Sequence, residues 1–378
     1  MSNINKKSCA PQVVSIFSGC GGLDLGFHME GYETIWANDF AEWAVKSFEK
    51  NLGKVIHLKD ITQINPYTDK SIPVCDVVLG GFPCQDFSII WKQPGLNGTR
   101  GGLFRHFAEF VDAKKPKAFV AENVKGLITA NRGKAIETII KDFESITPGY
   151  VVKPHLYNFA EYGVPQFRER VLFVGVRIDT GFDFIHPLPT HGPDAKQPYV
   201  TAGDALKGVK DVPYNNELIN IKEKTKKMLE MIPEGGNFKD IPEDSPYHVK
   251  GMISHVYRRL KLDEPAKTII AAGGGGTWGY HYPEPRPLTN RERARLQSFP
   301  DDFVFEGSVT EVRRQIGNAV PPEGVREVAK RLLPLFTGKY EPIDLKPEYN
   351  KMKKMSVKER LQSFCNFSNS LWRNCISD

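Results

Sequence analysis

A cysteine in the stretch Gly80-Gly81-Phe82-Pro83-Cys84-Gln85 has the setting of a chemically active residue. The apolar run at 74–79 before it is typical of a buried strand, so Cys84 would sit in a loop at a strand end. Cysteine thiols have a pKa of about 8.5, and nearby positive groups or a helix N-terminus lower it to roughly 3.5–7.5. The flanking glycines and proline impose an unusual loop geometry. They favour a reactive thiol over an inert one.

Three charged residues further along could act beside this cysteine. Glu122 follows the apolar run at 118–121, another expected strand, so its carboxyl group would face the same crevice as Cys84. Arg168 and Arg170 lead into an expected strand at 171–176, and the two-residue repeat of a strand would point them to the same side. Two guanidinium groups on one face need anions or carbonyl oxygens as partners. The alternative for Glu122 is that it caps a helix. The alternative for the two arginines is that they form a surface charge pair.

A glycine-rich turn marks a candidate cofactor site. The stretch Phe17-Ser18-Gly19-Cys20-Gly21-Gly22-Leu23-Asp24 follows an expected strand at 13–17 and precedes a helical pattern. Ligands of open parallel sheets bind beyond the carboxyl ends of the strands, and a helix N-terminus favours their negative groups. The spacing differs from the dinucleotide pattern G-x-G-x-x-G. A tight turn without a ligand is the alternative.

Two acids extend this candidate site. Asp39 follows the second expected strand, where a carboxylate can hold both hydroxyls of a ribose. Asp60 follows the third, where a carboxylate could accept a hydrogen bond from an exocyclic amine. Each alone could be a solvated loop acid or a helix cap. Because they come in order at successive strand ends, they indicate an adenosine-bearing cofactor.

These sites require elements that bring several strand ends together. Short apolar runs alternate with helical patterns, which predicts an α/β fold with a mostly parallel sheet and helices on both faces. Strands are expected at 13–17, 32–38, 55–57, 74–79, 118–121 and 171–176, and helices at 23–30, 41–52, 104–113 and 134–146.

The second half of the chain has a different character. The stretch at 187–287 is rich in proline and glycine, but its apolar residues persist, so an irregular domain is expected there instead of disorder. Helical patterns return at 290–297 and 324–335, and the polar, lysine-rich tail from residue 340 has little that demands a core. The expected organisation is a catalytic and cofactor-binding domain at 12–187, a second domain at 188–314, a returning segment at 315–337 and a C-terminal tail at 338–378.

The composition excludes several classes of protein. The 378 residues carry a net charge of +6, a mild bias toward a polyanionic partner. The six cysteines form no CxxC pair and have no ligand-spaced histidine, so neither a disulfide framework nor a metal site is expected. No uncharged apolar run is long enough to span a bilayer, and the N-terminus lacks the apolar region of a secretion signal. A cytoplasmic, nucleoid-associated protein without membrane contact is expected.

Taken in order, the motifs resemble those of the cytosine 5-position DNA methyltransferases of the bacterial restriction–modification type. The resemblance implies a Rossmann-like S-adenosylmethionine-dependent methyltransferase fold with a smaller irregular target-recognition domain. It also implies double-stranded DNA as substrate, S-adenosylhomocysteine as product and no metal. Action as a monomer is the default expectation, and in a restriction–modification setting a cognate restriction endonuclease would be a functional partner. The matching segments are 17–22, 83–85, 122–124, 166–170, 286–297 and 315–322.

The resemblance also implies residue roles. Cys84 would add to carbon 6 of a flipped-out cytosine, so that carbon 5 can attack a methyl group. Glu122 would hydrogen-bond or protonate N3, and Arg170 would hold O2 with Arg168 alongside. The loop at 89–103 would close over the flipped base. The implied cofactor-binding residues are Phe17, Ser18, Gly19, Gly21, Gly22, Leu23, Asp39, Phe40, Asp60, Ile61, Pro83, Asn318 and Ala319, and the implied DNA-binding residues are Gln85, Ser88, Arg100, Arg258, Arg259 and Thr268.

Two rival interpretations stay open. A minor branch of the same family methylates cytosine in transfer RNA, but it typically has a doubled proline before the cysteine, where this chain has Phe82 and Pro83. A catalytically silent DNA-binding protein could also keep the fold. Such a protein would be expected to lose the cysteine, the glutamate or the glycine turn, and all three are present here.

Overall fold

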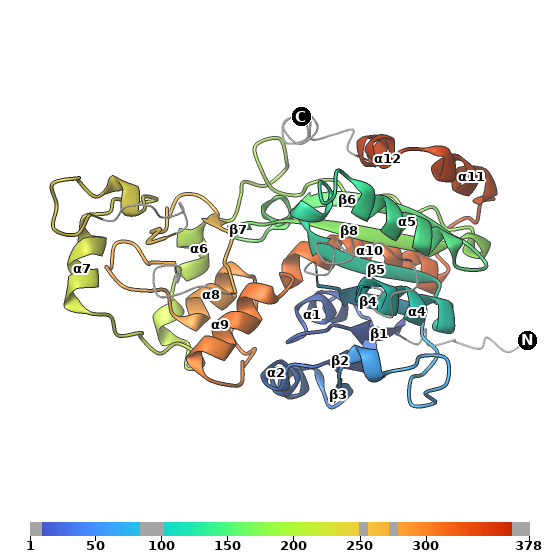
Figure 1. Ribbon diagram of the computed structural model, residues 1–378, viewed down its shortest axis with the longest axis horizontal. Helices are drawn as coiled ribbons and strands as arrows, with labels where there is room; N and C mark the ends of the chain where they lie inside the picture. Colours follow the sequence, from blue (N-terminus) through green and yellow to red (C-terminus); the bar gives the residue numbers. More distant parts are fainter. Residues whose placement is uncertain (1–9, 84–101, 249–255, 272–278, 365–378) are drawn as a thin grey trace, which may run out of the picture.

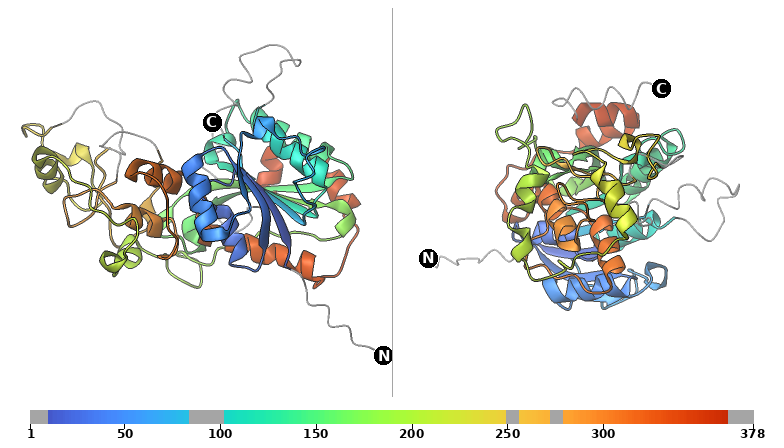
Figure 2. Two further views of the ribbon diagram at one scale, coloured as in Figure 1. Left: turned by 90° about the horizontal axis from the view of Figure 1, so that it is seen from below. Right: turned by 90° about the vertical axis from the view of Figure 1, so that its left-hand side faces the viewer.

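A computed structural model describes residues 10–83, 102–248, 256–271 and 279–364. Figure 1 shows two unequal lobes: a larger lobe built around a sheet, and a smaller lobe with little regular structure. The two further views in Figure 2 show the smaller lobe projecting from one side of the sheet layer.

The larger lobe contains a seven-stranded sheet in the order β3-β2-β1-β4-β5-β8-β6. Strands β1 to β5 pair in parallel, and β8 runs antiparallel between β5 and β6. The first five strands therefore bring their carboxyl ends to one edge of the sheet, and the antiparallel β8 begins at that same edge. The strands are β1 (Gln12–Ile16), β2 (Glu33–Asp39), β3 (Ile56–Leu58), β4 (Val77–Gly81), β5 (Ala118–Val124), β6 (Tyr150–Asn158) and β8 (Glu169–Arg177).

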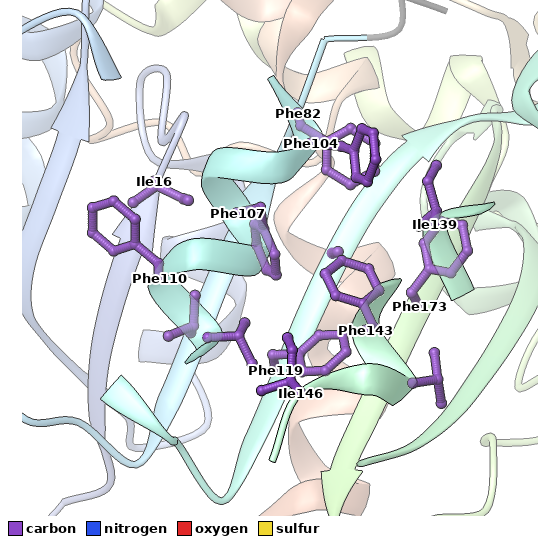
Figure 3. Close-up of a cluster of buried hydrophobic side chains, with 14 of the residues drawn as sticks. Ile16, Phe82, Phe104, Phe107, Phe110, Phe119, Ile139, Phe143, Ile146 and Phe173 are labelled. Atoms are coloured by element: carbon purple, nitrogen blue, oxygen red, sulfur yellow. The ribbon is translucent and has the colours of Figure 1, made fainter. Parts of the chain in front are cut away.

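Helices cover both faces of the sheet, which confirms the expected α/β architecture. On one face, α4 (Phe104–Lys114) and α5 (Lys134–Ser145) bury an aromatic cluster against the strands. On the other face lie α1 (Gly22–His28) and α10 (Pro322–Thr337), with α2 (Glu42–Leu52) over β2 and β3. Figure 3 shows the aromatic cluster, whose labelled phenylalanines are Phe82, Phe104, Phe107, Phe110, Phe119, Phe143 and Phe173.

The smaller lobe is joined to the sheet lobe by a two-stranded parallel pairing of β7 (Gln166–Phe167) with β9 (Ala266–Lys267). Two apolar clusters fill it, one around α8 and α9 and the other around α7. After this lobe the chain returns to the sheet lobe, where α10 packs against α1. The helices of the smaller lobe are α6 (Ala202–Leu206), α7 (Glu223–Glu230), α8 (Asn290–Leu296) and α9 (Val309–Asn318).

Two parts of the fold differ from the sequence-based expectation. Strand β6 was not expected, yet it is buried along most of its length. The C-terminal tail, expected to need no core, forms α11 (Lys346–Lys354) and α12 (Val357–Phe364), which pack on β6. Leu345 and Met352 are buried there, and Arg360 forms a buried ion pair with Glu144 of α5. That expectation was therefore wrong for residues 345–361.

No helix within the described ranges combines the length and the apolar character needed to cross a membrane.

Candidate active site and cofactor site

A mostly buried ion pair lies at the carboxyl edge of the sheet, between β5 and β8. The antiparallel register places Val124 opposite Arg170, and Arg170 Nε reaches Glu122 Oε1 at 2.9 Å. Both side chains are mostly buried, at 12% and 14% exposed for Glu122 and Arg170. Burial raises the pKa of the Glu122 carboxyl group, and the positive charges of Arg170 and Arg168 oppose that rise. The carboxyl group therefore holds a proton more readily than an exposed glutamate does.

The end of β4 is fitted closely against this pair. Gly81 lies opposite Glu122 in the β4–β5 register, and a Cβ atom at position 81 would lie 2.9 Å from Glu122 Oε2. Asn123 Nδ2 donates a hydrogen bond of 2.8 Å to the carbonyl oxygen of Phe82, whose ring is buried against α4. The backbone that enters the Pro83-Cys84 loop is therefore held beside Glu122. This hydrogen bond of Asn123 was not predicted from the sequence, although Asn123 directly follows the predicted site residue Glu122.

Four of the predicted site residues, Cys84, Gln85, Ser88 and Arg100, lie outside the described residues. The expected closing loop at 89–103 also falls there, apart from its last two residues.

Arg168 does not share the surroundings of Arg170. It lies between β7 and β8, in neither strand. Its buried guanidinium group donates to the carbonyl oxygens of Ile269 at 3.2 Å, Gly317 at 2.9 Å and Ala319 at 3.0 Å. Arg168 is thus bonded to carbonyl oxygens, whereas Arg170 forms an ion pair with Glu122.

The glycine turn after β1 is organised around Asp39. Gly19 and Gly21 have φ values of +56° and +91°, which residues with side chains rarely adopt. The Gly19 N–H donates to Asp39 Oδ2 at 2.8 Å, and the Ala41 N–H donates to Asp39 Oδ1 at 2.9 Å. Burial raises the pKa of Asp39. These bonds orient its carboxylate at the end of β2, directly beside the turn.

Two neighbouring strand ends carry the other predicted cofactor residues. Phe40 follows β2 and is 72% exposed, a high value for an aromatic ring. Asp60 follows β3, where it accepts hydrogen bonds from the N–H and hydroxyl of Thr62, and these bonds lower its pKa. Ile61 is buried beside it. Two oriented carboxylates around an exposed ring fit a ligand with ribose hydroxyls and an aminated aromatic base.

The segment after α9 reaches the same turn from the other side. A Cβ atom on Gly22 would lie 2.3 Å from the carbonyl oxygen of Val320, which shows how closely the two backbones pack. Asn318 is exposed and Ala319 half-buried next to this contact. Phe17, Ser18 and Pro83 are half-buried, whereas the side chain of Leu23 belongs to the apolar core under α1 and α10.

The predicted DNA-binding residues divide into two kinds. Arg259 is buried, and it donates to the carbonyl oxygens of four residues of its own lobe: Leu229, Ile232, His281 and Pro283. Its guanidinium group therefore holds the smaller lobe together, and its expected contact with DNA stays a prediction. Arg258 and Thr268 instead line a pocket that also includes Lys261 and Lys267.

Residues 12–333 match the family described as C-5 cytosine-specific DNA methylase. The chain belongs to this family. It is therefore a DNA (cytosine-5-)-methyltransferase, and methyl transfer in this family uses S-adenosylmethionine. The described residues contain no cluster of three or more histidine, cysteine, aspartate or glutamate side chains that could hold a metal ion.

The similarity to named methyltransferases extends over nearly the whole chain. It is 65% identical to the type II methyltransferase M.NgoFVII of Neisseria gonorrhoeae over 96% of each chain. It is 40% identical to the type II methyltransferase M.BbvI of Brevibacillus brevis, over 92% of this chain and 97% of the relative. A crystal structure of a putative DNA modification methyltransferase from an Escherichia coli prophage has the same fold, with a TM-score of 0.66 and 23% identity; the match covers 87% of this chain and all of that one.

Proposed function

We propose that this methyltransferase modifies carbon 5 of a flipped-out cytosine in a specific site of duplex DNA through a covalent adduct with Cys84. The observation that supports the proposal is the mostly buried Glu122–Arg170 pair, at the sheet edge where β4 ends shortly before Cys84 in the sequence. An acid and a cation held together at a strand end can recognise the polar edge of a base.

The ring of cytosine is electron-poor, so carbon 5 does not attack a methyl group unaided. Addition of the Cys84 thiolate to carbon 6 forms an S–C bond and moves the ring π electrons toward carbon 5, which makes that carbon a nucleophile. Bound S-adenosylmethionine supplies an electrophilic methyl group, and S-adenosylhomocysteine is the product. Loss of the proton from carbon 5 then expels the thiolate and restores the ring.

Glu122 and Arg170 would manage the charge on the base. Because burial raises its pKa, Glu122 can donate a hydrogen bond or a proton to N3 while electrons move into the ring. Arg170 holds the Glu122 carboxyl group and would donate to O2 of the same base. The negative charge that thiolate addition creates is therefore spread over N3 and O2 instead of remaining on carbon 5 alone.

The cofactor would occupy the strand ends around the glycine turn. Asp39 would accept hydrogen bonds from the ribose hydroxyls, and Asp60 would accept one from the adenine amine. Phe40 and Phe17 would lie against the adenine ring. The other proposed contacts are Ser18, Gly19, Gly21, Gly22, the backbone of Leu23, Ile61, Pro83, Asn318 and Ala319.

DNA would lie between the lobes, across the basic pocket near β9. Thr268 would contact the backbone, and Arg258 would lie near the bases. Gln85, Ser88 and Arg100 complete the proposed contacts from the segment after Cys84. Because two of its relatives are named type II methyltransferases, we place the protein in a restriction–modification setting, in which it acts as a monomer and protects DNA from a cognate endonuclease.

Bisulfite sequencing of DNA incubated with the protein and S-adenosylmethionine tests this proposal. Protected cytosines should fall at one recurring sequence, and Glu122→Gln should reduce the fraction protected at short times. Transfer RNA with labelled cofactor serves as the second substrate. Label in transfer RNA but not in duplex DNA would overturn the proposal in favour of the RNA-modifying branch.

A further inference from the structure

A junction of backbone contacts joins the two lobes between 165–168 and 266–269. Besides the β7–β9 pairing, the Ala266 N–H donates to the Pro165 carbonyl at 3.0 Å, and the Thr268 hydroxyl donates to the Phe167 carbonyl at 2.8 Å. The Ile269 N–H donates to Gln166 Oε1 at 2.8 Å, while the Ile269 carbonyl accepts from Arg168. Ile269 is thus held through both of its backbone polar groups by side chains from the sheet lobe.

The same two side chains also reach the segment that carries Asn318. Arg168 Nη2 donates to the carbonyl oxygens on both sides of that residue, those of Gly317 and Ala319. Gln166 Nε2 donates to Gln297 Oε1 at 2.9 Å, and Gln297 Nε2 donates to the Ile316 carbonyl at 2.6 Å. The smaller lobe and the Asn318 segment therefore share partners on one short stretch of the sheet lobe.

Backbone packing brings these two segments into direct contact. A Cβ atom on Gly317 would lie 2.3 Å from the backbone nitrogen of Ala271, so the segment that follows β9 and carries Thr268 runs directly against the end of α9. Neither backbone can shift toward the other without a clash. Arg168 bonds to both sides of this contact and lies two residues from Arg170.

From this geometry we infer that Arg168 is a positioning residue that couples the docking of the smaller lobe on DNA to the closure of the cofactor pocket. The inference rests on the proposed function, because it takes Thr268 to contact DNA and Asn318 to contact the cofactor. The planar guanidinium group holds its donors at fixed angles, so the three carbonyl oxygens keep one arrangement. A change in the position of Ile269 on DNA binding is passed to residues 317 and 319 through one rigid group.

Binding of S-adenosylhomocysteine with and without DNA tests this inference. The probe is a duplex that carries the site located by bisulfite sequencing, and the dissociation constant is measured by calorimetry. In the wild type, DNA should tighten S-adenosylhomocysteine binding within the usual coupling range of about 5-fold to 150-fold. In Arg168→Lys, a single ammonium group cannot span the three carbonyl oxygens, so the ratio of the dissociation constants without and with DNA should fall to about 2-fold or less.

Arg291→Lys is the matched control. Arg291 is also buried and also donates to three carbonyl oxygens, those of Tyr214, Pro300 and Phe303, but it lies away from the junction. This substitution removes a comparable set of bonds, so it should lower thermal stability as Arg168→Lys does and leave the coupling intact. Equal loss of coupling in both variants would show a general structural effect and would overturn the inference.

The remaining outcomes distinguish failure of the inference from failure of the proposed function. A wild type that methylates DNA but shows no coupling, or an Arg168→Lys variant that keeps it, would overturn the inference and leave the proposed function standing. A wild type that methylates no DNA would instead refute the proposed function. If Arg168→Lys does not fold, Gln166→Met replaces it and should weaken the coupling in the same direction; retained coupling in that variant would overturn the inference.

Discussion

Replacing Gly81 with alanine tests whether the position of Glu122 governs catalysis. The added Cβ atom would lie 2.9 Å from Glu122 Oε2, whereas ordinary contacts of this kind are 3.4–4 Å. The carboxyl group must therefore move by about 0.5 Å or more, the difference between 2.9 and 3.4 Å. Since Glu122 is also bonded to Arg170 at 2.9 Å, the shift disturbs both members of the pair.

A misplacement of about 1 Å can reduce a catalysed rate by about 100-fold. A shift of about half that size should reduce the rate of methyl transfer by roughly 10-fold to 100-fold, which corresponds to about 1.4–2.7 kcal/mol of activation free energy. The obstructing atom is the end of a side chain, so the fold can adapt, and the free energy of unfolding should change by less than about 1 kcal/mol.

The assay is single-turnover transfer of labelled methyl from saturating S-adenosylmethionine to saturating DNA. Gly126→Ala is the matched control, because a Cβ atom there meets no heavy atom within 4 Å. Gly80→Ala is the opposite control: its Cβ atom would lie 2.4 Å from the backbone oxygen of Ile16 in β1, so it should lower stability by about 1–3 kcal/mol. Full activity in folded Gly81→Ala would refute the reasoning that the carboxyl position matters.

Three further predictions follow from other parts of the structure. Phe40→Ala removes a ring that is 72% exposed. Loss of stacking on adenine should raise KM for S-adenosylmethionine about 10-fold with little effect on kcat. An unchanged KM would contradict the adenine contact. Burial raises the pKa of Glu122, and a rising pH removes its proton, so single-turnover rates should fall on the alkaline side. Glu122→Gln should be slower by about 100-fold or more and should no longer show this alkaline fall. If the fall persists in the variant, it belongs to another group. Arg360→Met leaves the buried Glu144 without its cation and should lower the free energy of unfolding in urea by about 3–5 kcal/mol, which a second substitution, Glu144→Leu, should largely restore.

The sequence was sufficient to place residues at strand ends. Parallel strands bring their carboxyl ends to one edge, so apolar runs followed by Asp39, Asp60 and Glu122 were enough to predict that these acids share an edge of the sheet. The ion pair between Glu122 and Arg170 could not be predicted from strand periods. It depends on β8 running antiparallel to β5 in one register, which local sequence does not determine.

The sequence could not show which arginines serve the site and which hold the fold. Arg168 and Arg170 look alike in a strand pattern, but in the folded chain one donates to carbonyl oxygens and the other pairs with a carboxylate. Arg259 looks like a DNA contact because it follows Arg258 in a basic stretch. Its carbonyl partners lie 22 to 30 residues away, and only the folded lobe brings them together.

Strand β6 and the tail were missed for a related reason. Lys153 interrupts the apolar pattern of β6, yet it is buried because Asp183 and the Phe184 carbonyl accept its hydrogen bonds. In the tail, the partner of Arg360 is Glu144, which lies 216 residues earlier in the chain. Buried charges of this kind look like surface residues until their distant partners are known.

Covalent trapping tests the central claim, that Cys84 is the nucleophile, most directly. The probe is duplex DNA with 5-fluorocytosine at the modified position, because fluorine at carbon 5 cannot leave as a proton does and the adduct stays attached to the protein. With S-adenosylmethionine present, the wild type should form a stable adduct, and peptide mass mapping should place it on Cys84; Cys84→Ser should form none. An adduct on another residue, or a wild type that methylates cytosine in DNA without ever forming an adduct on the fluorinated duplex, would contradict the claim.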